Sequence, residues 1–358
     1  MHTSNRMAFF DNLKVLMMAM VIAHHVGQAY GPTGGWWPVQ EPVRSELLGP
    51  FFMVNRSFGM SLFFLIAGYF TALSYERSGA RAVVKSRLLR LGIPLLVFSL
   101  LMVILQVFVF GPMDTGELGP IWPINVVHFW FVQHLILYSL GYVLWRHLRR
   151  GADEAAKRPL KLPGYGTVIL FAIGLALASA IVRTWYDIDE WVYLFGYIRT
   201  APADLPRDLA LFLVGALAYR NDWVSRFSSR SGRVWLGVGV VMAVLWYVFD
   251  LRLQYMITFN DSVWGLLFAL WESLLCCGMC IGLTVLFRDS VNSQTRFSSE
   301  MSKSTYAAYM IHVFVVILFQ FLVLQLAVPP LLKFFLVTLI AVPASFLLAS
   351  LIRKPLRL

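Results

Sequence analysis

Long apolar stretches alternate with short polar or turn-rich pieces along almost the whole chain. A helix that crosses a lipid bilayer needs about 20 mostly apolar residues. Ten segments come close to this length or exceed it: residues 8–30, 51–74, 91–110, 125–147, 164–184, 207–220, 234–250, 263–287, 304–326 and 331–352. The pattern predicts an all-α fold, a polytopic membrane helical bundle of about ten transmembrane helices. We see no internal repeat, so residues 1–358 are expected to form a single integral-membrane domain.

The composition excludes two broad classes of protein. Of the 358 residues, 59% are hydrophobic and 14% are charged, whereas soluble domains average about 45–50% apolar and about 25% charged residues. A soluble globular protein is therefore excluded as the first interpretation. A disordered chain is excluded as well, because such chains contain little apolar surface.

The formal charge of +11 raises the question of nucleic-acid binding. Most Lys and Arg residues fall in alternate polar pieces, which is the distribution of cytoplasmic loops in membrane proteins. This asymmetry predicts that both termini are cytoplasmic. On the opposite side, Trp37 and Trp185 are expected to belong to an aromatic belt at the membrane interface. Because topology explains the basic charge, we expect no nucleic acid as a partner.

Three ionisable residues interrupt the first apolar segment: Asp11, Lys14 and His25. Lys14 and His25 are 11 residues apart, which is about three helical turns, so both project from one face about 16 Å apart. Ionisable residues inside spans usually face a cavity or a partner and mark functional sites. The alternative is structural: Lys14 reaches the interface with its ammonium group, and His25 hydrogen-bonds a neighbouring helix.

Arg87 and Arg90 precede the third segment with a spacing of i, i+3, which places both on one face of an α-helix. Two guanidinium groups in this arrangement suit phosphate, because each donates parallel hydrogen bonds. The simpler alternative is a cytoplasmic cluster that touches anionic lipid headgroups.

Further candidates are single polar or aromatic residues within apolar segments. Glu272 lies in the middle of a predicted span, where a carboxyl group needs a partner or a proton. Tyr309 and His312 share a helical face at i, i+3. His128 and Trp130 lie in the fourth segment, and His128 is not placed to form a metal site with His134. We see no metal-binding spacing, so we expect no metal.

Five short motifs follow one another along the chain: Lys14 followed by His25 after ten residues, Phe63-Phe-Leu-Ile-Ala-Gly68-Tyr-Phe70, Arg87-Leu-Leu-Arg90-Leu-Gly-Ile-Pro94, His128-Phe-Trp-Phe131 and Tyr309-Met-Ile-His312. In this order they resemble the motifs of the membrane-bound acyltransferase-3 family. The chain departs from the family pattern twice. Lys14 stands where Arg is commoner, and Ala67 stands where Ser is common, which argues against a catalytic hydroxyl there.

The resemblance implies an O-acyltransferase of a bacterial-type inner membrane. Such an enzyme moves an acyl group, acetyl or succinyl, from cytoplasmic acyl-CoA, its co-substrate, to a hydroxyl of a carbohydrate or similar acceptor, often at the outer face. Within the family, the motifs look most similar to the glucan succinyltransferase-like branch, which modifies a polysaccharide of the cell envelope. The lipid bilayer is a further partner, and a homo-oligomer is possible.

The residues allow two mechanisms. His25 acts either as the general base that deprotonates the acceptor hydroxyl or as a covalent acyl carrier. Glu272 is a candidate carboxyl partner for His25. Arg87, Arg90 and Lys14 are expected to hold the phosphates of CoA, with a tunnel between the first and third helices. A transporter or flippase of a lipid-linked or sugar substrate is the alternative, and a non-catalytic membrane scaffold or receptor is the third class.

Overall fold

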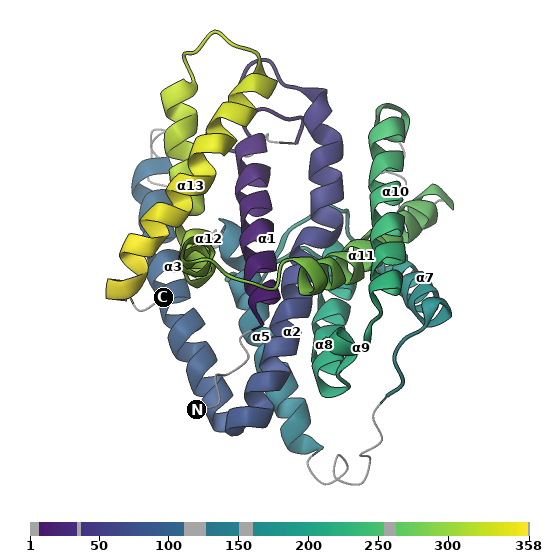
Figure 1. The fold of residues 1–358 in the computed structure, drawn as a ribbon. Helices are drawn as coiled ribbons and strands as arrows, with labels where there is room; N and C mark the ends of the chain where they lie inside the picture. Colours follow the sequence, from purple (N-terminus) through teal and green to yellow (C-terminus); the bar gives the residue numbers. More distant parts are fainter. Residues whose placement is uncertain (1–6, 34–36, 111–126, 150–159, 254–262, 357–358) are drawn as a thin grey trace. The chain divides into compact units, whose positions relative to one another are not determined.

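The computed structural model describes residues 7–33, 37–110, 127–149, 160–253 and 263–356 of the chain. Its α-helices are α1 (Ala8–Gly27), α2 (Gly49–Arg87), α3 (Ile93–Leu105), α5 (Trp130–Leu148), α7 (Tyr165–Val182), α8 (Leu205–Arg220), the short α9 (Trp223–Arg226), α10 (Ser229–Leu253), α11 (Val263–Ser290), α12 (Arg296–Val323) and α13 (Pro330–Leu356) (Figure 1). Single turns of other helical types are η1 (Glu46–Leu48), η2 (Leu88–Gly92), η3 (Gln106–Phe110), η4 (Val127–Phe129) and η5 (Pro202–Asp204). Each of the ten predicted segments overlaps a helix, although residues 125 and 126 of the fourth segment lie outside the described residues.

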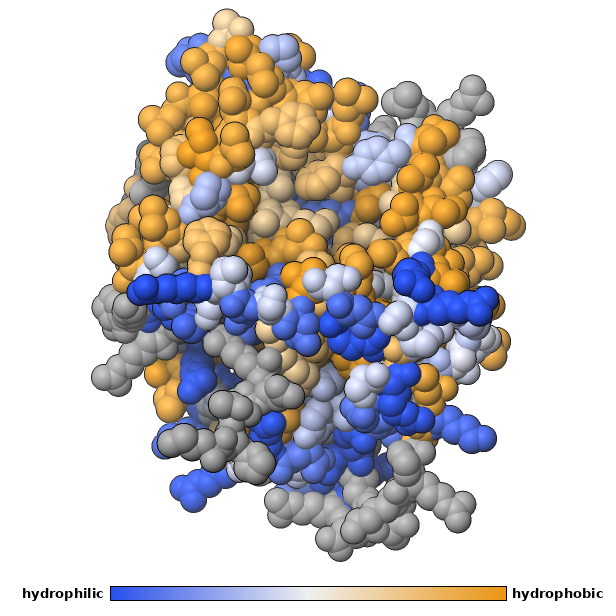
Figure 2. All heavy atoms as spheres, viewed as in Figure 1, coloured by the Kyte–Doolittle hydropathy of each residue, from blue (hydrophilic) through white to orange (hydrophobic). Residues whose placement is uncertain are grey.

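Seven stretches of the described residues are long and apolar enough to cross a membrane. One of them, Glu46–Phe108, contains the predicted segment 51–74 and most of the segment 91–110. The count of ten crossing helices therefore stays a prediction, as do the sides of the termini. The outward surface of these helices is apolar: Leu322, Leu339 and Leu351 are 64–75% exposed. Figure 2 shows this apolar surface over the α12–α13 pair, as expected for helices that face lipid.

The described residues also contain one small β-hairpin, so the fold is nearly all-α rather than purely α. Strands β1 (Val192–Leu194) and β2 (Ile198–Thr200) pair in antiparallel register, with Tyr193 opposite Arg199. Gln133 of α5 supports the hairpin, because its Oε1 accepts from the Arg199 amide at 3.1 Å and its Nε2 donates to the Tyr197 carbonyl at 2.8 Å. Burial lowers the pKa of the Arg199 guanidinium, which stacks 4.2 Å above the Trp191 ring.

The chain forms two compact units, and each is described by itself. The first unit contains Met1–Phe63, Phe227–Ile257 and Trp271–Leu358, and the second contains Phe64–Arg226 and Thr258–Leu270.

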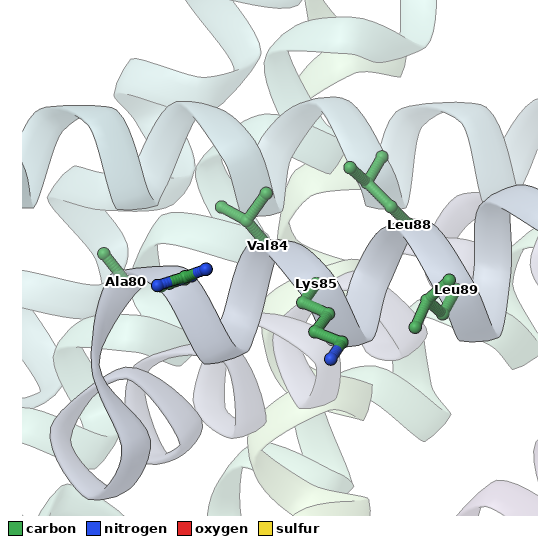
Figure 3. A pocket seen from close by; sticks show the side chains of 6 residues that line it. Ala80, Val84, Lys85, Leu88 and Leu89 are labelled. Carbon is green, nitrogen blue, oxygen red and sulfur yellow. The ribbon is translucent and has the colours of Figure 1, made fainter.

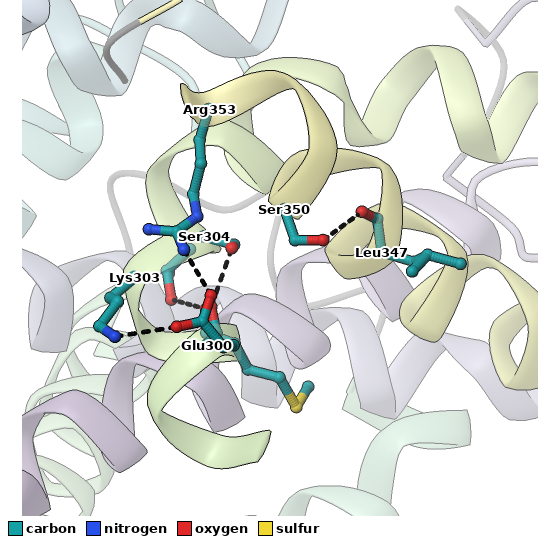
Figure 4. A network of polar contacts seen from close by, with 8 residues as sticks. Glu300, Lys303, Ser304, Leu347, Ser350 and Arg353 are labelled. Atoms are coloured by element: carbon teal, nitrogen blue, oxygen red, sulfur yellow. Dashed lines mark hydrogen bonds and ion pairs between the residues drawn. The ribbon is translucent and has the colours of Figure 1, made fainter. Parts of the chain in front are cut away.

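In the first unit, α12 and α13 form an antiparallel hairpin against which α1 packs (Figure 1). The start of α12 is fixed by a capping box, in which the Thr295 hydroxyl accepts from the Ser298 amide at 3.1 Å and the Ser298 hydroxyl accepts from the Thr295 amide at 3.0 Å. One turn later, Glu300 binds both Lys303 and Arg353, the latter near the end of α13 (Figure 4). The capping box provides hydrogen-bond acceptors for backbone N–H groups at the start of α12. The Glu300–Arg353 ion pair connects the first turns of α12 with the end of α13.

In the second unit, a buried aromatic core holds α2, α5 and α8 together. It is formed by the following side chains: Phe64, Ala72, Tyr75, Val83, Tyr142, Val143, Phe212 and Ala216. At Gly68 of α2 and Gly215 of α8 the two backbones approach closely. A Cβ atom on Gly68 would lie 1.9 Å from the Phe212 carbonyl oxygen, and one on Gly215 would lie 1.9 Å from the Leu65 carbonyl oxygen.

Helix α2 is interrupted at Gly79, where φ is 76° and ψ is 172°. The left-handed φ suits glycine, because other residues carry a Cβ that clashes there. After this break the chain folds back on itself. Arg87 Nη2 lies 2.9 Å from Thr71 Oγ1, although 16 residues of continuous helix would separate the two residues by about 24 Å.

The contact of α2 with α8 gives a first prediction. We expect Gly68→Ala to lower the melting temperature of the purified protein, because the methyl group would force the two backbones apart at a cost of about 1–3 kcal/mol. Gly141→Ala is the matched control, since a Cβ there meets nothing within 4 Å. Equal melting temperatures for both variants would contradict the close packing.

Candidate active site

The packing of α1 against α12 brings two histidines together. The His312 Nε2 and His25 Nδ1 atoms lie 3.3 Å apart, and the ring centroids are 4.8 Å apart with an interplanar angle of 70°. His312 is fully buried. The pair joins residues that are 287 positions apart in the sequence, so no local pattern connects them.

Backbone carbonyls fix the tautomer of each ring. His25 Nδ1 lies 2.9 Å from the Val21 carbonyl oxygen, and His312 Nδ1 lies 2.7 Å from the Tyr309 carbonyl oxygen. A carbonyl oxygen only accepts, so both Nδ1 atoms carry the hydrogen. In the neutral rings each Nε2 therefore has the lone pair. His312 Nε2 accepts a long hydrogen bond from His25, and His25 Nε2 is a base.

Trp37 covers the imidazole of His25. The two ring centroids are 5.7 Å apart, and Trp37 is only 1% exposed. Its indole N–H donates to Gln320 Oε1 at 2.7 Å, and Gln320 Nε2 donates to the Val26 carbonyl at 3.0 Å. The expectation that Trp37 belongs to an aromatic belt at the membrane interface is therefore wrong: the side chain is buried and hydrogen-bonded inside the first unit.

The segment that carries Trp37 is fixed at a second point. Lys333, at the start of α13, is 3% exposed and places its ammonium group 2.6 Å from Glu41 Oε1 and 2.9 Å from the Leu324 carbonyl. The Glu41 amide in turn donates to the Ala29 carbonyl at 3.2 Å. A buried ion pair of this kind holds the chain in one position, because separating the two charges would leave each without its counter-charge.

His24, which directly precedes His25, has a packing role. Its ring lies edge-on to Phe52 with centroids 5.0 Å apart, and its Nδ1 lies 3.3 Å from Asn55 Nδ2. These contacts connect α1 with the start of α2.

Lys14 and Asp11 form an ion pair on α1, with the Lys14 Nζ and Asp11 Oδ1 atoms 2.8 Å apart. Their side chains are 29% and 12% exposed, respectively. The binding of CoA phosphates by Lys14 stays a prediction.

The second unit contains the two predicted arginines, and they differ in their surroundings. Arg87 donates to Thr71 Oγ1, whose oxygen lies 3.3 Å from Ser139 Oγ. Arg90 is exposed. The stretch Leu88–Gly92 is a π-helix, whose wider turn changes the face on which Arg90 lies. Arg87 and Arg90 therefore lie in different surroundings, although their i, i+3 spacing would place them on one face of an α-helix. The predicted tunnel between α1 and α3 involves both units and stays a prediction.

The remaining candidates are buried, except for Trp130, which is half-buried. In the first unit, Glu272 of α11 is 2% exposed and Tyr309 is 7% exposed. In the second unit, His128 packs 4.0 Å from Phe129, while Trp130 lies 5.5 Å from both His134 and Trp191, all measured between ring centroids. Roles for these residues in the reaction stay predictions. Among the described residues, no three His, Cys, Asp or Glu side chains gather as metal ligands.

Sequence reasoning missed Gln320 and the position of Trp37. Gln320 carried a usable signal, because it is a polar amide within an apolar stretch and such a group needs a partner. The roles of the Val21 and Tyr309 carbonyls had no signal in the sequence, since every residue has a carbonyl group.

The fold and this site define a class: a helical, multi-pass membrane protein with a buried imidazole pair. Residues 7–350 match the family model described as an acyltransferase domain. The chain belongs to the acyltransferase-3 family, and it is an integral multi-pass membrane protein.

Several curated proteins are similar to this chain. Those of Salmonella schwarzengrund (strain CVM19633), Salmonella agona (strain SL483) and Salmonella enteritidis PT4 (strain P125109) are each named glucans biosynthesis protein C. Each is 25% identical over 249 residues, which cover 65% of this chain and 63% of the relative. The chain thus spans less than two thirds of these relatives. No solved structure matches it.

Trp37→Phe tests the cover over His25. This change keeps an aromatic ring but removes the indole N–H, which leaves Gln320 Oε1 buried without its donor. We expect a lower melting temperature, since an unpaired buried polar group costs about 1–3 kcal/mol. Trp185→Phe is the matched control, because Trp185 is 71% exposed and should tolerate the change. A Trp37→Phe protein as stable as this control would show that the hydrogen bond contributes nothing.

Proposed function

We propose that the protein is a membrane O-acyltransferase that transfers an acetyl or succinyl group from cytoplasmic acyl-CoA to a hydroxyl of a carbohydrate or similar acceptor at the outer face. The proposal includes a bacterial-type inner membrane, ten crossing helices and cytoplasmic termini. The single observation that carries it is the His25–His312 pair, in which the hydrogens on Nδ1 leave His25 Nε2 as a base within an acyltransferase family domain.

In the proposed reaction, His25 Nε2 accepts the proton of the acceptor hydroxyl while the oxygen attacks the thioester carbonyl. The new C–O bond forms as the C–S bond breaks. The proton then passes from His25 to the leaving sulfur, so the products are an ester and CoA with a free thiol. The proposed steps need neither a metal ion nor an oxidant or reductant.

His312 is the positioning residue in this scheme. When His25 becomes an imidazolium, its Nδ1–H faces two acceptors, the Val21 carbonyl and His312 Nε2. A positive charge strengthens both hydrogen bonds. This arrangement would supply the orientation and charge stabilisation that the buried aspartate supplies to the histidine of a Ser-His-Asp triad. Glu272 remains a second proposed partner.

The relatives' name supports the choice of acceptor. Proteins named for glucan biosynthesis match this chain, and the motifs resemble those of the glucan succinyltransferase-like branch. We therefore propose a glucan as the acceptor to test first, with succinyl-CoA and acetyl-CoA as donors.

His25→Ala tests the base. Removal of a general base usually slows a reaction by about 10²–10⁴-fold, so we expect loss of acyl transfer to glucan oligosaccharides with donor binding retained. His147→Ala, which changes an exposed histidine, is the control and should keep full activity. Wild-type turnover in the His25→Ala protein would exclude His25 as base and as acyl carrier.

The same assay separates the roles around His25. His312→Ala should lower kcat with little change in the donor KM, and His312→Gln should recover part of kcat because its amide oxygen can accept from His25. Labelled acyl-CoA, supplied without acceptor, distinguishes the two mechanisms. Label retained by the wild type and absent from His25→Ala would establish a covalent carrier in place of the base.

The donor site is tested by Arg87→Ala/Arg90→Ala. A ligand that binds the folded state raises its melting temperature, so acetyl-CoA or succinyl-CoA should stabilise the wild type and fail to stabilise this variant. Stabilisation of both proteins would exclude the arginines as phosphate ligands. The absence of any shift with any CoA species, together with acyl-CoA-independent movement of sugar substrate in vesicles, would favour a transporter.

A further inference from the structure

A second cationic surface lies beside the arginines of the proposed donor site, and the proposed reaction does not use it. It begins directly after the backbone break at Gly79, where Ala80, Arg81, Val84, Lys85, Leu88 and Leu89 line a shallow pocket of about 550 Å³ (Figure 3). All six residues belong to the second unit.

The six lining residues together cover about half of the circumference of the helix, an arc of about 180°. At about 100° per residue, Arg81, Lys85 and Leu88 lie within an arc of about 60°. Arg87 lies outside this arc and donates to Thr71 Oγ1 in the interior of the unit. The fold thus separates the cations of this segment, because Arg87 points inward whereas Arg81 and Lys85 are exposed.

The exposed surface changes character along this helix. Its first two turns present Arg81 and Lys85, and the next presents Leu88 and Leu89, which are 47% and 50% exposed. The apolar surface then continues into α3, where Ile93, Leu96 and Leu100 are 52–63% exposed. Figure 3 shows Lys85 and Leu89 following one another on one side of the helix, with Val84 and Leu88 on the other.

This order of groups matches the order of groups in a phospholipid. Cations at the level of the headgroups attract anionic lipids, while exposed leucines below them contact acyl chains without a desolvation cost. Soluble phosphate would use only the cations and would leave the exposed leucines without a role.

We propose that the pocket at Ala80–Leu89 binds an anionic phospholipid, with an acyl chain in the apolar pocket along Leu88 and Leu89 and the phosphate at its edge, beside the exposed Arg81 and Lys85. The proposal requires only that the protein is embedded in a membrane and does not depend on the proposed acyl transfer.

Native mass spectrometry of the full-length protein from phosphatidylcholine nanodiscs containing phosphatidylglycerol tests this site. The wild type should retain phosphatidylglycerol, and Arg81→Ala/Lys85→Ala should bind it about 30-fold more weakly, since each cation near an anionic membrane contributes about a fivefold factor. Leu89→Ser should weaken phosphatidylglycerol while leaving any binding of inorganic phosphate unchanged.

Two controls make the result specific. Arg149→Ala/Arg230→Ala removes two exposed cations elsewhere in the chain and should retain the lipid; an equal loss there would overturn the proposal in favour of net charge. Arg87→Ala/Arg90→Ala should also retain phosphatidylglycerol, even where it loses acyl-CoA. Displacement of phosphatidylglycerol by inorganic phosphate or by acetyl-CoA at the Arg81–Lys85 surface would overturn the lipid assignment.

Discussion

Polar side chains within apolar helices must find their hydrogen-bond partners inside the protein, because lipid offers none. In the first unit this requirement is met along α1 and its neighbours. Asp11 pairs with Lys14, His25 meets His312, and Gln320 joins Trp37 to the Val26 carbonyl. Two of these contacts link α1 or the segment after it to α12. They therefore fix which turns of the two helices face one another, which apolar packing alone specifies less sharply.

The same requirement determines the chemistry that the site can perform. Backbone carbonyls at i−4 and i−3 hold the Nδ1 hydrogens of both imidazoles, and a helix supplies such carbonyls without any special residue. The two rings can thus be oriented while neutral, with no permanently buried charge to stabilise. A positive charge is needed only when His25 takes up a proton, and two acceptors already face its Nδ1–H.

In the second unit, the backbone break at Gly79 is followed by cations in two different environments, one in the interior and the others on the surface. The left-handed turn at Gly79 lets the chain fold back so that Arg87 reaches Thr71, while Arg81 and Lys85 remain on the surface. Gly68 has a different role, because it permits the close approach of α2 and α8. The glycine of that motif thus contributes packing rather than a reactive group.

The positions of the helices, the membrane setting and the candidate base His25 could all be predicted from the amino-acid sequence. Apolar length is a local property, which is why ten apolar segments overlap helices, and an imidazole within an apolar stretch is conspicuous without any neighbour. Contacts between residues that are distant in the sequence became evident in the folded protein alone. Trp37 is buried because Gln320, 283 positions away, accepts its N–H, and the partner seen beside His25 is His312. The β-hairpin at 192–200 is held by hydrogen bonds with Gln133 of α5. The π-helix that follows Arg87 means that Arg87 and Arg90 do not lie on the same helical face, although their i, i+3 spacing predicts it. Sequence separation hides such contacts, since packing rather than local propensity brings the residues together.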